Sequence, residues 1–210
     1  MLRDIRKQYD YSALNEDEAK KNPFDQFEIW LNTALNSEEQ EPTAMILSTV
    51  NRLLQPHSRL VLLKDFNPDG FVFYTNYDGN KAKEMAGNNQ VHLLFFWQSL
   101  ERQVRISGDV EKVPDAVSDS YFQSRPLDSR IGAWVSEQSA EIPSAKYLDD
   151  RFTFFQKKFG DQVPRPPHWG GYLVRPVTFE FWQGRPNRLH DRLLYSKTKG
   201  GDWKITRLAP

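Results

Sequence analysis

The feature that most constrains the fold is a series of short apolar runs separated by turn residues. The runs cover residues 43–50, 59–65, 71–76, 91–97, 101–113, 170–182, 189–196 and 203–208. Runs of this length between turn signals are typical of β-strands. Because few helices interrupt them and the order is not βαβ, they predict a closed antiparallel barrel that is mainly β with peripheral helices.

Local signals refine this expectation. The turn sequence 67–70 (Asn-Pro-Asp-Gly) predicts that 59–65 and 71–76 form a β-hairpin. The nearly unbroken apolar run 91–97 predicts a strand buried on both faces. Arg59 and Lys64 bracket a second apolar run, and their different parity predicts that they point to opposite faces of a buried strand.

Helices are expected at four places. Asn22-Pro23 is a capping residue followed by proline, and an apolar stripe follows it: Phe24, Phe27, Trp30, Leu31 and Leu35. Shorter helices are predicted over 78–88, from Pro114 through Arg125, and over 144–159. Residues 1–22 are polar and highly charged, which predicts a mobile arm ahead of one domain at 23–210.

Composition excludes several classes of protein. Lysine plus arginine (28) equals aspartate plus glutamate (28), so a nucleic-acid partner is not expected. There is no cysteine, no apolar signal segment and no run long enough to cross a bilayer, which predicts a cytoplasmic protein. The four histidines have no metal-ligand spacing. Gly-x-Ser-x-Gly and Gly-x-Gly-x-x-Gly motifs are absent as well.

The stretch 180–192 is the hardest to explain as packing. If the chain extends after the Gly184–Pro186 turn, Arg188, His190 and Arg192 lie on one face of a strand. A solvated edge strand is one interpretation. We favour a site for an anion and an aromatic ring, because edge strands usually carry lysine or mixed charge.

The same stretch carries a resemblance. Phe181-Trp-Gln-Gly184 with Arg188-Leu-His-Asp-Arg192 resembles the C-terminal signature of the pyridoxamine 5′-phosphate oxidase family. Further blocks agree in order and spacing over nearly the whole chain: 59–64, 73–76, 100–103, 121–126, 131–136 and 207–210. The resemblance implies an FMN-binding split barrel that forms a homodimer with two sites at the interface.

The implied reaction is oxidation of pyridoxamine or pyridoxine 5′-phosphate to pyridoxal 5′-phosphate, with O2 as electron acceptor and H2O2 as product. The implied catalytic residues are Arg188 and His190. The resemblance assigns FMN to Arg59, Leu60, Val61, Leu62, Leu63, Lys64, Tyr74, Thr75, Asn80, Lys81, Gln103, Gln138, Ser139, Trp182 and Arg192. It assigns the substrate to Arg6, Tyr9, Lys64, Tyr121, Arg125, Ser129, Arg188, Leu189 and His190.

Within these assignments, Arg59 would face the FMN phosphate and Lys64 the substrate. Gln138 and Ser139 would come from the partner subunit. The residue types of the substrate set suit this role, because arginine forks and hydroxyl groups bind phosphate oxygens. His190 is a candidate for proton movement, although a single histidine is weak evidence for that role.

The chain departs from the family pattern at one place. The usual Ser-Arg-Lys is Gly79-Asn80-Lys81 here, so one phosphate-contacting arginine and one hydroxyl are missing. Backbone amides at the helix N-terminus and Lys81 remain available. The departure keeps a second hypothesis open, a flavin- or B6-phosphate-binding module without turnover. A flavin reductase using a nicotinamide cofactor is a third, which a short phosphate-sized grip disfavours.

Overall fold

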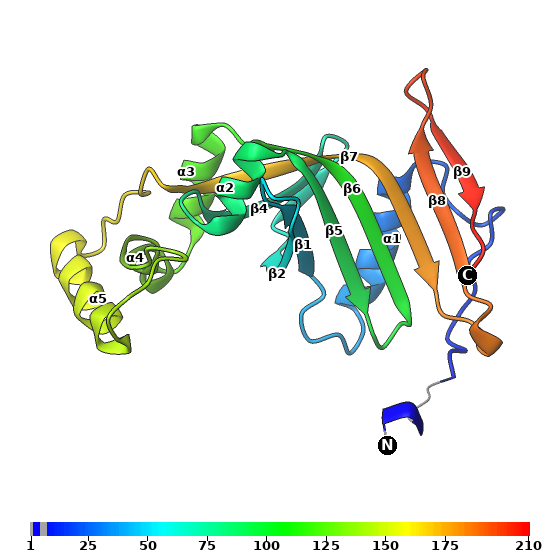
Figure 1. The fold of residues 1–210 in the computed structure, drawn as a ribbon, viewed down its shortest axis with the longest axis horizontal. Coiled ribbons are helices and arrows are strands. Elements are labelled where there is room, and N and C mark those ends of the chain that lie inside the picture. Colours follow the sequence, from blue (N-terminus) through cyan, green and yellow to red (C-terminus); the bar gives the residue numbers. More distant parts are fainter. Residues whose placement is uncertain (1, 5–7) are drawn as a thin grey trace.

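The longest strand, β7 (Trp169–Gln183), organises the sheet because it pairs with three other strands (Figure 1). One edge pairs with β6 over residues 172–183. On the other edge, β4 pairs with residues 169–174 and β8 pairs with residues 178–183. A strand with two successive neighbours on one edge divides the sheet, which gives the barrel its split.

The computed structural model describes residues 2–4 and 8–210, and all pairings in its nine-stranded sheet are antiparallel. The other strands are β1 Ala44–Val50, β2 Pro56–Leu62, β3 Asp65–Asn67, β4 Gly70–Asn76, β5 Gln90–Trp97, β6 Arg102–Lys112, β8 Asp191–Lys197 and β9 Trp203–Arg207. The helices are α1 Pro23–Leu35, α2 Asn80–Gly87, α3 Asp115–Ser124, α4 Leu127–Val135 and α5 Ala145–Phe159, with 3-10 turns η1 Leu2–Asp4 and η2 Pro186–Arg188.

The sheet order β2-β1-β5-β6-β7-β4-β3 curls back on itself. The Lys64 N–H, between β2 and β3, donates to the Val72 carbonyl of β4 at 2.9 Å and extends the β3–β4 pairing by one residue. The expected mainly-β architecture with peripheral helices is therefore confirmed. Helices α4 and α5 project at one end of the molecule, and β8 and β9 form the other end (Figure 1).

Helix α1 fills the barrel with aromatic rings. The Asn22 side chain caps it by accepting the Phe24 N–H at 3.0 Å, as the sequence predicts. Phe27 is fully buried, with its ring centroid 4.9 Å from that of Phe71 and 5.0 Å from that of Phe95. Leu35 was wrongly placed in the stripe: it is 51% exposed, because the chain turns away where the Asn36 side chain bonds back to a helical carbonyl.

Two expectations about strands are wrong. The predicted hairpin over 59–76 is confined to β3 and β4 around the turn at 67–70, because β2 pairs with β1 instead. As a consequence β2 is an edge strand, and Leu60 is 70% exposed within one chain. Strand β5 alternates between buried and accessible residues, with Phe96 50% exposed, so only one of its faces is fully buried.

The N-terminal arm packs on the β8–β9 end. Leu14 is buried, and its N–H donates to the Asp191 carboxylate at 3.0 Å. The Tyr195 hydroxyl donates to the Lys20 carbonyl at 2.9 Å, and the Arg207 guanidinium pairs with Glu16. These contacts explain how a highly charged segment docks; the mobility of the arm stays a prediction, and Arg6 lies outside the described residues.

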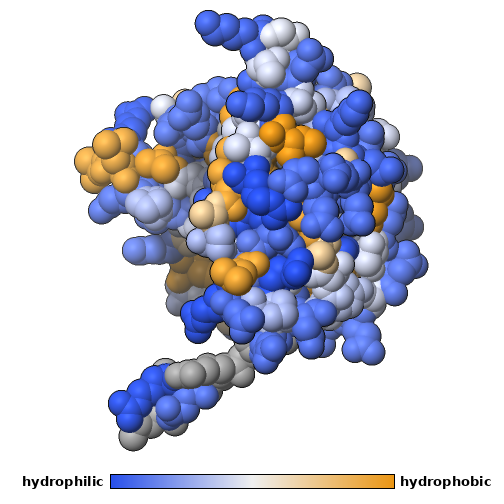
Figure 2. Space-filling model, turned by 90° about the vertical axis from the view of Figure 1, so that its right-hand side faces the viewer, coloured by the Kyte–Doolittle hydropathy of each residue, from blue (hydrophilic) through white to orange (hydrophobic). Residues whose placement is uncertain are grey.

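The surface at the β8–β9 end is mainly hydrophilic, with separate hydrophobic patches (Figure 2). The terminal strand β9 presents exposed polar side chains such as Lys204 and Thr206 along its free edge, which discourages edge-to-edge pairing. Among the described helices, none has the length and apolar character needed to span a membrane.

We expect Phe27→Ala to lower the free energy of unfolding by about 3–5 kcal/mol, because it removes a fully buried ring from the barrel core. Leu35→Ala, in the same helix, is the matched control and should change it by no more than about 0.5 kcal/mol. Urea unfolding at a fixed FMN concentration measures both. Equal losses would contradict the assignment of the buried face.

Candidate active site

A cavity of about 670 Å³ lies between β2, β4, α2 and the junction of α3 with α4. Four cationic side chains line it, and the described lining residues include no carboxylate. The lining comprises Arg59, Leu60, Val61, Leu62, Lys64, Tyr74, Thr75, Lys81, Tyr121, Arg125, Pro126, Ser129, Gln138 and Trp169. Such an excess of positive charge favours an anionic ligand.

The α3–α4 junction brings Tyr121, Arg125 and Ser129 to this cavity, as the sequence predicts. They do not share one continuous helix, because Arg125 is the extended residue after α3 and Pro126 caps α4. The Arg125 Nη1 is buried without a hydrogen-bond partner among the described residues. Burial lowers the Arg125 pKa, so an anion that accepts this donor would stabilise the charged guanidinium.

An aromatic stack supports this grip. The Tyr74 and Tyr121 ring centroids lie 3.8 Å apart, and the Arg125 guanidinium lies 4.6 Å from the Trp169 ring centroid. Burial raises the pKa of both tyrosines, so their phenols keep their protons and can donate. Sequence reasoning missed Trp169. The available signal was Gly171, two residues after Trp169. A Cβ at Gly171 would lie 2.8 Å from the Tyr74 ring, so only glycine lets that ring pack closely against β7.

Several polar side chains gather at the start of α2. The Lys81 Nζ donates to Gln138 Oε1 at 2.6 Å and to Thr75 Oγ1 at 3.1 Å. The Asn80 N–H donates to Ser139 Oγ at 3.3 Å. Burial, with the nearby Arg59 charge, lowers the Lys81 pKa, and a bound anion would oppose that effect.

Gly79 allows this arrangement. A Cβ at that position would lie 2.5 Å from Gln138 Oε1, so a serine there would displace the glutamine from its observed position. The departure from the family pattern is therefore coupled to the loop that carries Gln138. The resemblance assigns Gln138 and Ser139 to the partner subunit, whereas in the structure they lie beside Thr75 and Lys81 of their own chain.

Arg59 and Lys64 both line the cavity, so the expectation that they face opposite sides is wrong. Lys64 lies beyond the end of β2 at Leu62, and strand parity does not extend to it. The Arg59 Nη2 pairs with Glu84 Oε2 at 3.2 Å, and Glu84 also bonds His57 Nδ1 at 2.6 Å. Sequence reasoning missed Glu84, and only its placement on α2 reveals that it contacts Arg59.

A second group of predicted site residues lies away from the cavity, across β6, β7 and β8. The strand register aligns Gln103, Trp182 and Arg192 in one row, so these three predicted FMN residues share a face of the sheet. Arg192 is neutralised by Glu180, which lies 2.9 Å from it and also pairs with Arg105 at 3.2 Å. Arg192 therefore has a carboxylate partner within its own chain.

Arg188 and His190 are not on a strand. The turn η2 covers Pro186–Arg188, in which Asn187 (φ 59°) and Arg188 (φ 63°) have left-handed backbones, and β8 begins at Asp191. The prediction that they alternate with Arg192 along one strand face is therefore wrong. The turn leaves Leu189 68% exposed and Arg188 exposed.

Tyr9 joins this second group from the arm. Its ring centroid lies 5.6 Å from that of His190 and 5.7 Å from that of Trp182. Gly184 makes room for it, because a Cβ there would lie 2.9 Å from Tyr9 atoms. The arm thus brings one predicted substrate residue against the predicted catalytic histidine.

The cavity and the second group lie at opposite ends of β7. Trp169 lines the cavity and Trp182 belongs to the second group, so roughly 40 Å of strand separates them. One chain cannot place both around one small ligand. The described residues include no cluster of three metal-binding side chains.

Family models match most of the chain. Residues 31–157 match the model described as pyridoxamine 5′-phosphate oxidase. Residues 169–210 match the model described as the pyridoxine 5′-phosphate oxidase C-terminal dimerisation region, which supports a homodimer.

Known proteins agree. Proteins named pyridoxine/pyridoxamine 5′-phosphate oxidase from Gloeothece citriformis and Cupriavidus metallidurans are 53% and 49% identical to this chain; the alignments cover 100% of it and 98% and 99% of those proteins. The crystal structure of PhzG from Burkholderia lata 383, in complex with tetrahydrophenazine-1-carboxylic acid, superposes with a TM-score of 0.88 at 28% identity, covering 94% of this chain and 98% of that one. On these matches in sequence and fold, the chain belongs to the pyridoxamine 5′-phosphate oxidase family.

Proposed function

We propose that this protein oxidises pyridoxamine 5′-phosphate and pyridoxine 5′-phosphate to pyridoxal 5′-phosphate, using FMN, with O2 as electron acceptor and H2O2 as product. The observation that carries the proposal is the cavity lined by four cations, in which a buried arginine donor has no hydrogen-bond partner among the described residues. The relatives that are about 50% identical over the whole chain carry the name of this activity.

The cavity offers two groups of phosphate ligands. Arg59 and Lys81, with the Thr75 and Gln138 polar atoms, suit the FMN phosphate, and Ser139 lies beside them at the Asn80 N–H. Lys64, Tyr121, Arg125 and Ser129 suit the substrate phosphate, because they combine two cations with two hydroxyl donors. A protein that only binds flavin has no use for these substrate-phosphate ligands. Their presence disfavours the hypothesis of a flavin-binding module without turnover.

When bound, the flavin supplies the hydride acceptor and the electron transfer to O2. Beside FMN, the exposed apolar edge Leu60–Leu62 would contact the ring system, and Gln103, Trp182 and Arg192 would come from the sheet row. The protein's contribution is orientation: phosphate anchors at one end hold the substrate C4′ in position.

A second copy of the chain would complete the site. Because the cavity and the group of Tyr9, Trp182, Arg188 and His190 lie at opposite ends of β7, a two-fold dimer can bring the cavity of one copy to the second group of the other. Such an arrangement generates two equivalent sites. The match of residues 169–210 to a dimerisation region supports it.

The likeness to PhzG raises oxidation of a reduced phenazine carboxylic acid as a second candidate. The two sets of phosphate-binding side chains favour a phosphorylated substrate, because a single carboxylate would leave part of this cationic lining unpaired.

We expect the purified protein to be yellow and, with FMN added, to consume O2 on addition of either pyridoxamine or pyridoxine 5′-phosphate. Formation of H2O2 and pyridoxal 5′-phosphate in equal amounts would identify the reaction. Pyridoxamine without phosphate and tetrahydrophenazine-1-carboxylic acid are the control substrates. Turnover of the phenazine compound alone would overturn the proposal.

Arg125→Ala should lower kcat/KM for pyridoxamine 5′-phosphate by about 10–100-fold, because a charge-assisted phosphate contact contributes about 1.5–3 kcal/mol. The matched control is Arg175→Ala on β7, whose guanidinium is 50% exposed and pairs with surface carboxylates. Steady-state O2 uptake with the phosphorylated and the unphosphorylated amine measures both. If the loss is the same for the two amines, Arg125 does not bind the phosphate.

Arg188→Ala should lower turnover by about one to two orders of magnitude while FMN stays bound, because the side chain positions the substrate and does not hold the cofactor. Flavin absorbance after gel filtration measures retention, and O2 uptake measures turnover. Normal turnover would show that Arg188 has no such role.

A further inference from the structure

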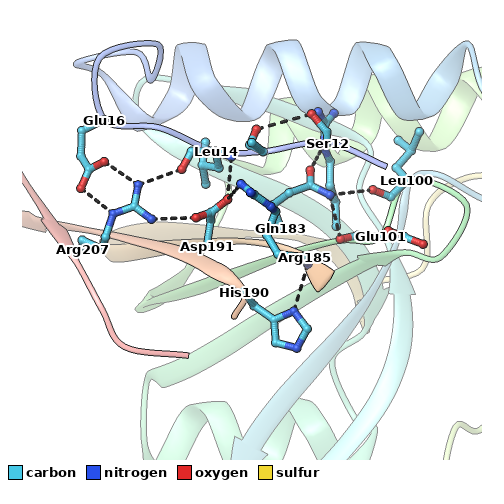
Figure 3. A network of polar contacts seen from close by, with 12 residues as sticks. Ser12, Leu14, Glu16, Leu100, Glu101, Gln183, Arg185, His190, Asp191 and Arg207 are labelled. Atoms are coloured by element: carbon cyan, nitrogen blue, oxygen red, sulfur yellow. Dashed lines mark hydrogen bonds and ion pairs between the residues drawn. The ribbon is translucent and has the colours of Figure 1, made fainter. Parts of the chain in front are cut away.

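The histidine predicted to be catalytic has one ring nitrogen already occupied. The Arg185 backbone N–H donates to His190 Nδ1 at 3.1 Å (Figure 3). A backbone N–H can only donate, so Nδ1 must be an unprotonated acceptor. In a neutral imidazole the proton then lies on Nε2, and Nε2–H is the group that a ligand can meet.

A single carboxylate holds the donor segment in place. Asp191 is 8% exposed, and its Oδ2 accepts the Arg185 Nη1 at 2.9 Å. The same oxygen accepts the Leu14 N–H at 3.0 Å, and Oδ1 accepts the Arg207 Nη1 at 2.8 Å. Burial alone would raise the Asp191 pKa, but these hydrogen bonds outweigh burial and hold the pKa below its usual range. The carboxylate therefore stays charged and keeps Arg185 anchored.

The other end of the turn is equally restrained. Gln183 is fully buried, and its Nε2 donates to the Leu100 carbonyl at 3.2 Å. The Gly184 N–H donates to the Glu101 carbonyl at 2.8 Å. With both ends fixed, the Arg185 N–H cannot move away from His190 without breaking several buried contacts.

The surroundings also oppose protonation of the ring. The described charged or titratable groups around His190 are the Arg188 and Arg185 guanidinium groups, the Asp191 carboxylate and the Tyr9 phenol. Burial lowers the His190 pKa, the Arg188 charge lowers it further, and Asp191 acts in the opposite direction. Protonation at Nδ1 would in addition direct two N–H groups at each other and break the bond from Arg185.

We propose that Arg185 and Asp191 are positioning residues that keep His190 as the neutral Nε2–H tautomer, so that His190 donates a hydrogen bond to the substrate and does not accept its proton. This role rests on the proposed oxidase function. The tautomer does not, since it follows from contacts within the chain. The flavin would take the C4′ hydrogen with its electron pair. With the alcohol substrate the hydroxyl proton leaves as well and would pass to water, and with the amine substrate water would hydrolyse the resulting imine, so neither reaction needs a proton acceptor at this ring.

The tautomer can be observed directly. Full-length, FMN-loaded protein with 15N-labelled histidine should show, in long-range 1H–15N spectra at pH 7.5, an unprotonated Nδ1 and a protonated Nε2 for His190. A spectrum of His190→Gln assigns the signal among the four histidines. On lowering the pH, the ring should stay neutral below the ordinary histidine pKa of about 6.5. An imidazolium or an Nδ1–H tautomer at pH 7.5 would overturn the proposal, whether or not the protein proves to be an oxidase.

Variants test the positioning residues. Arg185→Ala keeps the backbone N–H but removes the anchor to Asp191, so a second tautomer should become visible, and Arg185→Lys should restore the single one. Asp191→Asn should behave like Arg185→Ala. A single unchanged tautomer in both Arg185→Ala and Asp191→Asn would show that the anchor is not needed.

Kinetics separate donor from base. His190→Gln keeps a side-chain N–H donor, so its kcat/KM should stay within about tenfold of the parent, and His190→Leu should lose about tenfold more. If kcat/KM of the parent protein falls off as the pH is lowered through neutrality, the His190→Gln variant should show the same fall. Disappearance of that fall in His190→Gln would identify His190 as the titrating base and contradict the donor role.

Discussion

The strand β7 is the constraint on which the rest of the structure depends. Its fifteen residues are longer than any neighbour, so one edge must serve β4 and then β8. That division gives the barrel its opening and separates the cationic cavity from the turn with Arg188 and His190. In the proposed function, a second copy of the chain brings both groups to one ligand. The dimer in this proposal is therefore a consequence of strand length and pairing.

Charge is distributed unevenly between the two groups. Beside the second group, Glu180 pairs with Arg192, and Asp191 pairs with both Arg185 and Arg207, the latter of which also pairs with Glu16. In the cavity, Arg59 pairs with Glu84, but Lys64, Lys81 and Arg125 have no carboxylate among the described residues that line it. Although the net charge of the whole chain is zero, positive charge is in local excess around the cavity, where it would favour a bound phosphate. The row of Gln103, Trp182 and Arg192 thus has its cation paired, whereas the cavity keeps an excess of positive charge.

The sequence predicted most elements of this arrangement and fewer of the connections between them. The capped helix at Pro23 and the turn at 67–70 were predicted correctly because their signals are local. The partner of β2 and the exposure of Leu60 were not, because strand pairing depends on distant segments. Strand parity also failed at Lys64 and at Arg188, where the regular backbone ends before the residue. Glu84, Trp169 and Asp191 are partners of site residues, and only the fold reveals that relation.

The fastening of the arm by Asp191 has a consequence for how this protein can evolve. One carboxylate binds the arm at Leu14, the turn at Arg185 and the terminal strand at Arg207. Three segments that are far apart in the chain therefore lack independent freedom to vary. Loss of charge at Arg185 or Arg207 would remove a partner of this carboxylate, and a larger residue at buried position 14 would move the arm away from it, so we expect these positions to change together across descendants of this sequence.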